Sequence, residues 1–129
     1  MIKVVAALIE KDNKVLIAKR STGDPDLLGK WEFPGGKVEP DEDEKSAIER
    51  EIREEFELYV KAKDFVINSI CEYPTKTVDL RLYSCDYIKG NFKLHDHSEY
   101  VWVDKKELLD YDLAPADIIL AKFVKEEQR

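Results

Sequence analysis

Short apolar runs separated by polar turns predict several β-strands along this chain. Residues 2–9 and 14–20 form two such runs, and the charged turn Lys11-Asp12-Asn13 lies between them. Later runs predict strands near residues 64–73, 77–87 and 100–103. Residues 31–38 form a short extended piece broken by a proline and two glycines, and residues 21–30 are expected to be a loop.

The spacing of apolar residues changes to that of a helix after residue 40. Ile48, Ile52 and Phe56 recur every four positions, with Ala47 beside them, and acidic residues precede them, as suits a helix N-terminus. This pattern predicts a helix from Asp41 or Asp43 to about Phe56. A second helix is predicted over 115–127.

Strands before and after one central helix, with no linker between them, indicate an α/β chain with mixed strands. The length of 129 residues suits a single domain over 1–129. No apolar run approaches the ~20 residues that cross a bilayer, and the N-terminal segment is unlike a signal peptide. We therefore expect a cytoplasmic location and no membrane partner, with Cys71 and Cys85 reduced and half-buried.

The charge of the chain is unevenly distributed. The net charge is −7, which disfavours non-specific binding to nucleic acid or anionic membranes. Ten acidic and three basic residues lie between residues 39 and 57, so this segment alone matches the net charge of the chain. Such a segment is either a solvated helix face or a cation site.

Three glutamates of the predicted helix bear on this choice. Glu51, Glu54 and Glu55 are three or four positions apart, which places their carboxylates on one flank. Like charges at that spacing destabilise a helix by about 0.2–0.5 kcal/mol per pair, a penalty that a divalent cation removes. Mg²⁺ prefers oxygen ligands and keeps several waters, so these carboxylates plus substrate phosphates suit it. Surface pairs such as Arg50 with Glu54 are the alternative interpretation.

A double glycine upstream favours the cation site. Gly35 and Gly36 permit close approach of the backbone to a ligand. Gly36 is followed by five residues, Glu42, seven residues and then Arg50-Glu51-Ile52-x-Glu54-Glu55. This arrangement closely resembles the signature of the Nudix family. The chain departs from the family pattern at Glu57 and Asp41, where glycines are usual; Asp41 is itself a plausible helix cap.

The resemblance extends over nearly the whole chain and implies an α/β/α sandwich with a mixed sheet. Flanking segments resemble the subgroup that sanitises nucleotide pools, such as Trp31-Glu32-Phe33-Pro34 and Leu113-Ala114-Pro115-Ala116-Asp117. That subgroup hydrolyses a nucleoside triphosphate to the monophosphate and pyrophosphate. The implied substrates are 8-oxo-dGTP, CTP or modified dCTP, the implied cofactor is Mg²⁺ with Mn²⁺ as a substitute, and the implied assembly is a monomer or homodimer.

The resemblance also implies roles for acidic and basic residues. Glu51, Glu54 and Glu55 would hold the metal with the carbonyl of Gly35, and Glu51 would deprotonate the attacking water. Glu42 would support the site by pairing with Arg50. A late carboxylate often adds a ligand or base in this family, and Glu99 and Asp96 are the candidates here; each is otherwise an ordinary loop acid.

The remaining implied roles concern the nucleotide. Arg20 would bind phosphates in a bidentate manner, and Gly36 would let the backbone approach the ligand. Tyr73, Phe33 and Trp31 are candidates to stack on the base, with core packing as the alternative. Asp117 would read the base edge as an ionised hydrogen-bond acceptor, and its alternative role is a cap of the last helix. His95 and His97 are expected to be surface loop residues.

Two other functions remain open. A nucleotide-sensing module would keep the fold without turnover, although it has no need of three metal-binding glutamates. A Nudix hydrolase of another nucleoside diphosphate derivative is equally compatible with the motif. A plain acidic scaffold does not explain the double glycine at its fixed distance from the helix.

Overall fold

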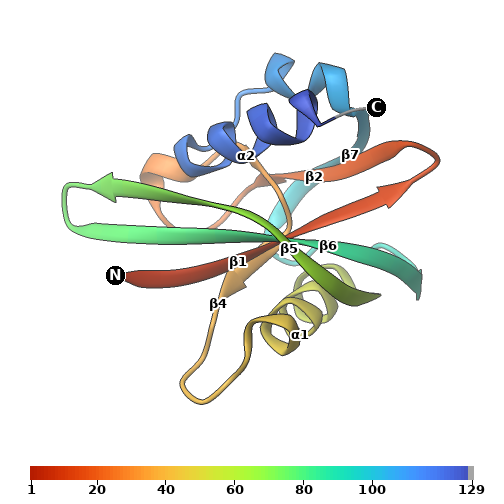
Figure 1. The fold of residues 1–129 in the computed structure, drawn as a ribbon, viewed down its shortest axis with the longest axis horizontal. Coiled ribbons are helices and arrows are strands. Elements are labelled where there is room, and N and C mark those ends of the chain that lie inside the picture. Colours follow the sequence, from red (N-terminus) through yellow and green to blue (C-terminus); the bar gives the residue numbers. More distant parts are fainter. Residues whose placement is uncertain (128–129) are drawn as a thin grey trace.

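A computed structural model describes residues 1–127, which form a mixed sheet of seven strands with one α-helix on each side of it (Figure 1). The strands are β1 (Ile2–Lys11), β2 (Lys14–Arg20), β3 (Trp31–Glu32), β4 (Gly35–Lys37), β5 (Leu58–Tyr73), β6 (Lys76–Gly90) and β7 (His97–Asp104). The helices are α1 (Glu44–Phe56) and α2 (Pro115–Glu126), with short 3₁₀ helices η1 (Pro25–Leu27) and η2 (Lys105–Asp110). The predicted α/β/α arrangement is confirmed.

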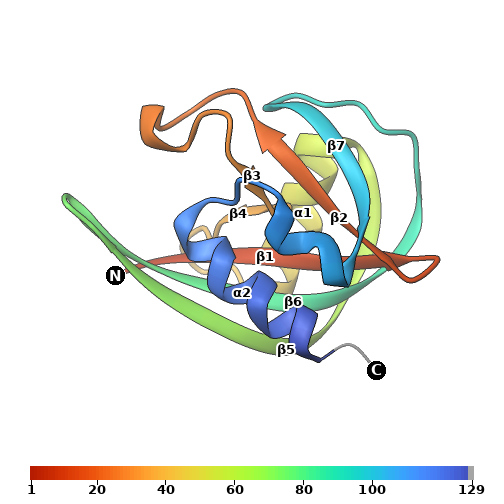
Figure 2. The ribbon, with the colours of Figure 1, turned by 90° about the horizontal axis from the view of Figure 1, so that it is seen from above.

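The strands of the sheet follow the order β3-β2-β1-β6-β5, with β4 paired to β1 and β7 paired to β2. Strand β1 runs parallel to β6 and antiparallel to β2 and β4. Figure 2 shows β2 and β7 diverging from the long β5–β6 hairpin, with α2 crossing between them. Strand β4, which precedes α1, pairs with β1. This pairing places Gly36 opposite Val5 and Gly35 opposite Ala6.

Two hydrophobic cores hold the helices to the sheet. The first contains the predicted stripe of α1, namely Ala47, Ile48, Ile52 and Phe56, all fully buried against β1, β2 and β5. The second lies under α2 and includes Leu120, Ala121 and Val124. Because the apolar stripe of α1 is buried, the neighbouring flank with Glu51 and Glu55 faces away from the first core.

The ends of α1 differ from expectation at one residue and agree at another. The N-cap is Asp43, whose carboxylate accepts a hydrogen bond from the Ser46 backbone N–H at 2.8 Å, so a cap at Asp41 was wrong. Asp41 instead adopts a left-handed backbone with φ of 64° in the preceding turn. Glu57 ends the helix in the left-handed conformation, φ 55°, that a glycine usually takes.

The predicted strands and helices are present, and four of the strands, β1, β5, β6 and β7, are longer than the pattern indicated. Strand β5 begins at Leu58 and β6 ends at Gly90, and the 3₁₀ helix η1 lies in the segment 21–30 that was expected to be a loop. Within residues 1–127, no helix is long and apolar enough to cross a membrane.

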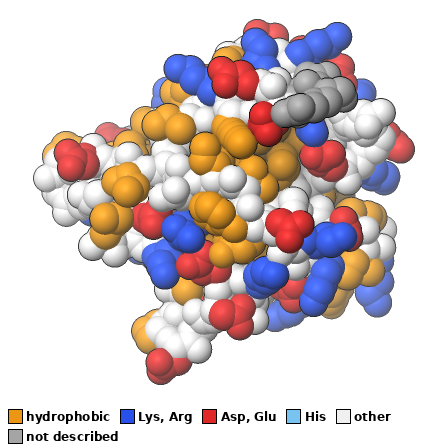
Figure 3. Space-filling view, viewed as in Figure 1, with side chains coloured by type: hydrophobic (Ala, Val, Ile, Leu, Met, Phe, Trp, Pro, Cys, Tyr) orange, Lys and Arg blue, Asp and Glu red, His pale blue; other side chains and the backbone are white. Residues whose placement is uncertain are grey.

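Both cysteines are free, as predicted; Cys71 is half-buried, whereas Cys85 is buried rather than half-buried. On the face in Figure 3, apolar side chains gather at the centre, among charges of both signs.

Candidate active site

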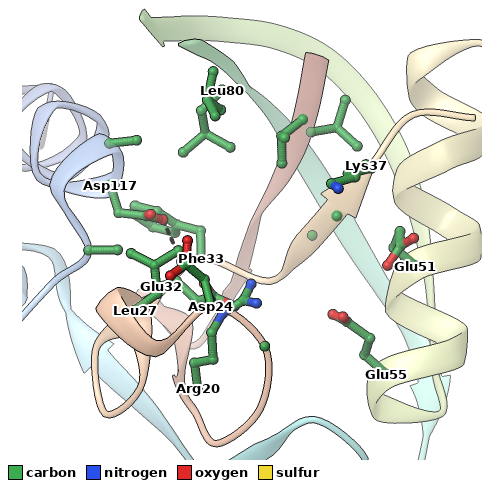
Figure 4. A pocket seen from close by; sticks show the side chains of 18 of the residues that line it. Arg20, Asp24, Leu27, Glu32, Phe33, Lys37, Glu51, Glu55, Leu80 and Asp117 are labelled. Atoms are coloured by element: carbon green, nitrogen blue, oxygen red, sulfur yellow. Dashed lines mark hydrogen bonds and ion pairs between the residues drawn. The ribbon is translucent and has the colours of Figure 1, made fainter. Parts of the chain in front are cut away.

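A cavity of about 460 Å³ lies between α1, the start of α2, the η1 loop and the β5–β6 hairpin. Figure 4 shows Glu51 and Glu55 pointing into it from α1, with Asp117 at the opposite side and Arg20 and Glu32 between them. The cavity thus has an end formed by carboxylates of α1, here called the carboxylate end. It also has an end formed by Phe33 and Asp117, here called the α2 end.

The double glycine belongs to the carboxylate end for a steric reason. A Cβ atom on Gly36 would lie 2.2 Å from Oε2 of Glu51, far inside van der Waals contact. A Cβ atom on Gly35 would lie 1.9 Å from the carbonyl oxygen of Val5 on β1. Glycine is therefore required at both positions, so that β4 can pair with β1 while the Glu51 carboxylate lies against its backbone.

Arg50 orders the carboxylates around Glu51. Its Nε and Nη2 donate to the two carboxylate oxygens of Glu42 at 2.8 and 3.0 Å, and its Nη1 donates to Oε1 of Glu51 at 2.8 Å. Nη1 also reaches Oε2 of Glu54 at 3.2 Å. The hydrogen bond from Arg50, followed by one from the Glu39 backbone, lowers the pKa of Glu42 to about 2. The pairing of Glu42 with Arg50 is the one expected from the sequence.

Glu55 has an unusual environment for a carboxylate of α1. Its Oε2 atom is buried and has no hydrogen-bond partner among the described residues. Burial, together with repulsion from Glu51, Glu32 and Asp96, raises the pKa of Glu55 to about 8. Burial also raises the pKa of Glu51, against the opposing effect of Arg50. A cation close to these two carboxylates would relieve both the burial and the repulsion.

These residues fit a hard divalent cation in their chemistry, because they offer carboxylate oxygens, one of them unpaired. Across residues 1–127, however, no three His, Cys, Asp or Glu side chains already form a metal-binding cluster. Mg²⁺ usually takes only a few protein carboxylates and completes its shell with water and substrate phosphate. Two facing glutamates are therefore compatible with such an ion.

At the α2 end, Asp117 is buried and bound to the backbone of a distant loop. Its Oδ1 accepts a hydrogen bond from the Phe33 backbone N–H at 2.9 Å. Burial, followed by repulsion from Glu32, raises the pKa of Asp117 well above its ordinary value. This shift runs against the expectation of an ionised Asp117, because the low dielectric and a neighbouring negative charge disfavour the charged form. It is also not the cap of α2, since Ala114 occupies that position.

Arg20 and Glu32, which line the cavity, form a network with the buried side chain of His97. Nε and Nη2 of Arg20 donate to the two oxygens of Glu32, each at 3.1 Å. Nε2 of His97 lies 2.9 Å from Oε2 of Glu32. The bidentate face of Arg20, expected to bind phosphate, is thus directed at Glu32. The surface position predicted for His97 was wrong, because its side chain is only 1% exposed.

Several residues singled out in the sequence lie away from the cavity. Trp31 packs edge-on against Tyr111, with ring centroids 5.2 Å apart, and is not part of the lining. Glu99 lies on β7 and pairs with Lys19 at 3.5 Å, with 59% of its side chain exposed. Asp96, the other late carboxylate, is near enough to repel Glu55. His95 is exposed, as expected, and lies 2.8 Å from Glu57.

Of the other singled-out residues, Phe33 and Tyr73 do line the cavity, whereas Glu54 does not.

The sequence analysis assigned no role to several residues that line the cavity. Lys37 follows the double glycine, and its side chain lies near the carboxylate end (Figure 4). Lys76 of the hairpin and Asp24 of the η1 loop pair at 3.7 Å between two walls. Of these residues, Glu32 could have been found from the sequence, because it lies between Trp31 and Phe33 in an extended segment that is expected to be partly buried. A buried acid almost always has a partner, so this position indicated an ion pair.

Comparisons with known proteins agree with the overall fold. Residues 1–126 match the family model described as NUDIX domain. The chain is 42% identical over 120 residues to the CTP pyrophosphohydrolase of Escherichia coli (strain K12), covering 93% of this chain and 88% of that protein. It is 40% identical over 117 residues to the putative 8-oxo-dGTP diphosphatase 2 of Mycobacterium tuberculosis, covering 88% and 81% of the two. The crystal structure of the MutT protein from Methanosarcina mazei Go1 is similar with a TM-score of 0.85 and 31% identity, covering 99% of this chain and 96% of that chain.

Proposed function

Because the chain belongs to the Nudix family of hydrolases, we propose that it hydrolyses a nucleoside triphosphate to the monophosphate and pyrophosphate. The preferred substrate is CTP or a modified or oxidised nucleotide such as 8-oxo-dGTP, by analogy with its relatives. Its place is the cytoplasm, where nucleotide pools are hydrolysed, and residues 1–129 act as one domain. The observation that carries the proposal is one cavity with the unpartnered carboxylate oxygen of Glu55 at one end and the buried acid Asp117 at the other.

Nudix hydrolases generally need a divalent metal ion, usually Mg²⁺. In this chain, we propose that Glu51 and Glu55 hold it, joined by Glu54 and the carbonyl of Gly35. When bound, such an ion cancels phosphate charge and lowers the pKa of an attacking water. The partnerless Oε2 of Glu55 supports this assignment. Mn²⁺ offers similar ligand preferences and is expected to substitute.

The reaction also needs a base and a fixed geometry. Glu51 accepts the proton of the attacking water. A new P–O bond forms either to the α-phosphorus, with pyrophosphate as the leaving group, or to the β-phosphorus, with the nucleoside monophosphate as the leaving group; in both cases the leaving oxygen keeps the electrons of the P–O bond that breaks. The raised pKa of Glu51 suits this role, because a base acts best when its pKa is near the working pH. Arg50 holds Glu51 at 2.8 Å and is itself fixed by Glu42, so both residues position the base. Lys37 adds a positive charge toward the phosphates.

The base of the nucleotide is placed at the α2 end of the cavity. Phe33 and Tyr73 supply aromatic walls, and Asp117 supplies the polar group. Since Oδ1 of Asp117 already accepts the Phe33 N–H, the neutral acid has its hydroxyl available as a donor to the base. A donor of this kind matches a ring nitrogen or carbonyl acceptor, such as N3 or O2 of cytosine.

A substrate panel tests the proposal. The common nucleoside triphosphates, 8-oxo-dGTP, 5-methyl-dCTP and ADP-ribose are compared by kcat/KM in the presence of Mg²⁺, with the released phosphate product identified. We expect pyrophosphate as product, a preference for one of the proposed nucleotides, and loss of turnover with EDTA that Mg²⁺ restores. Nucleotide binding without turnover would identify a sensing module instead, and a preference for ADP-ribose would identify a hydrolase of nucleoside diphosphate derivatives.

A further inference from the structure

His97 is a buried histidine that the proposed reaction does not use. Its ring stacks on Phe56, the last residue of α1, with centroids 4.9 Å apart and planes at 24°. Its Nε2 lies 2.9 Å from Oε2 of Glu32, and its Nδ1 is buried without a hydrogen-bond partner among residues 1–127. A polar ring is expensive to bury, so its contact with Glu32 calls for an explanation.

The direction of this hydrogen bond follows from the chemistry of its partner. Glu32 also accepts two hydrogen bonds from Arg20, one on each carboxylate oxygen. Because both oxygens already act as acceptors, we assign Nε2 of His97 as the donor to Oε2 of Glu32. His97 therefore supplies one N–H to Glu32, and Arg20 supplies the other two donors from the opposite side.

Glu32 in turn lies at the centre of the cavity. It lines the wall between Arg20 and Asp117, and its side chain is only 10% exposed. Without His97, Oε2 of Glu32 would keep only its bond to Nη2 of Arg20, and the pair could rotate together into the cavity. With Arg20 as its only remaining partner, the Glu32 side chain could change rotamer at a small cost in free energy.

We propose that His97 is a positioning residue that fixes the carboxylate of Glu32 and, through it, the guanidinium of Arg20 for nucleotide binding. This inference rests on the proposed function, because it assigns the network to the nucleotide cavity. His97 lies on β7 and Glu32 on β3, the two strands that flank β2 on either side, so the hydrogen bond also spans the strand that carries Arg20. The stacking on Phe56 sets the plane of the ring and hence the direction of Nε2–H.

Two substitutions separate the hydrogen bond from the packing. His97→Phe keeps an aromatic ring on Phe56 but removes the donor, whereas His97→Gln keeps an N–H donor at nearly the same reach. His97→Leu serves as a second variant without the donor. We expect the variants without the donor to raise KM about tenfold with kcat changed less than about twofold, and Gln to restore KM largely.

The matched control is His95→Gln, two residues away, where the histidine is exposed and pairs with Glu57 outside the cavity. Its KM should equal that of the wild type. Equal KM values in the wild type and in both donor-free variants would overturn the inference, as would a failure of His97→Gln to recover KM.

A readout without turnover keeps this inference separate from the proposed function. NMR of the Nε–H group of Arg20 and of the ring nitrogens of His97 reports the network directly, in the unliganded protein. We expect a slowly exchanging Arg20 Nε–H and an Nε2–H tautomer of His97 in the wild type, and faster exchange of Arg20 Nε–H in His97→Phe but not in His97→Gln. If exchange is the same in all three proteins, the positioning role is refuted even if the enzyme is active. If the network behaves as expected but no nucleotide is hydrolysed, the proposed function fails instead.

Discussion

The two ends of the cavity are built in different ways. The carboxylate end comes from one continuous segment, in which Gly35 and Gly36 meet Glu51 and Glu55 through a turn and a single helix. The α2 end combines residues that are far apart in the sequence, with Phe33 bound to Asp117 across a sequence separation of 84 residues. A site built from one continuous segment can be predicted from the sequence, whereas a site that depends on the order of the strands cannot.

Each end also contains a buried acid with a raised pKa, but their partners differ. Glu55 has an oxygen without a partner in the described part of the chain, while Asp117 accepts a backbone N–H. The first arrangement suits an acid that becomes ionised when a cation binds, and the second suits an acid that stays neutral and donates a hydrogen bond. Changes that neutralise each acid therefore test the difference.

Glu55→Gln should have the largest effect on catalysis. The amide cannot bind a divalent cation as a carboxylate does, and changes to outer-shell partners alone cost about 10–100-fold, so we expect kcat to fall by more than about 100-fold. Glu57→Gln, which changes an exposed carboxylate two residues away, should leave kcat within about twofold. Steady-state kinetics at saturating Mg²⁺ measure both, and near-wild-type turnover of Glu55→Gln would exclude the carboxylate end as the metal site.

The same substitution should stabilise the metal-free protein at high pH. The pKa of Glu55 is raised to about 8 in the folded state, so the wild type loses stability as pH rises from about 4.5 toward 8. Removing the titrating group should increase the free energy of unfolding at pH 8 by on the order of 2 kcal/mol, with little change near pH 4. Urea unfolding in EDTA at the two pH values provides the measurement; a stabilisation that does not depend on pH would point to a packing effect instead.

Gly36→Ala tests whether the double glycine acts through Glu51. The added Cβ would overlap the Glu51 carboxylate, so the Glu51 side chain must move. This movement would misplace the proposed catalytic base. We expect kcat to fall about 10–100-fold, since misplacing a catalytic group by about 1 Å can cost 100-fold. Gly29→Ala is the opposite case, because Gly29 has open space around it but a φ of 79°. It should lose about 1 kcal/mol of stability and keep its kcat.

These tests bear on how far the sequence predicts the site. The family, the α/β/α fold and both α-helices were predicted correctly, because the apolar stripe Ile48, Ile52, Phe56 and the motif are local. The burial of His97 was missed, since it depends on Phe56 and Glu32 approaching from other strands and helices. The raised pKa of Asp117 was missed for the same reason: the effects of burial and of Glu32 exist only once the chain is folded.

Asp117→Asn should change the selectivity of the enzyme more than its rate. The amide is neutral and similar in shape, but it cannot present a hydroxyl donor and an accepting oxygen in the same way. We expect the ratio of kcat/KM between the preferred nucleotide and its competitor to shift about tenfold, with maximal kcat changed less than threefold. The substrate panel measures this ratio, and an unchanged order of preference would exclude Asp117 as the group that reads the base.

Substitutions of the two late carboxylates, Glu99 and Asp96, should differ in their effect on kcat/KM. Glu99→Gln should have the smallest effect of all the substitutions. Glu99 is 59% exposed and pairs with Lys19 on the neighbouring strand, a surface pair worth at most about 1 kcal/mol to stability. Its kcat/KM should remain within about twofold of the wild type. Asp96→Asn removes a charge that repels Glu55 and weakens the hydrogen bond from Thr22 at 3.3 Å, because an amide oxygen is a weaker acceptor than a carboxylate. We expect kcat/KM to fall about fivefold in this variant. The reverse order, with Glu99→Gln the more damaging, would require β7 to bring Glu99 into the cavity when substrate binds.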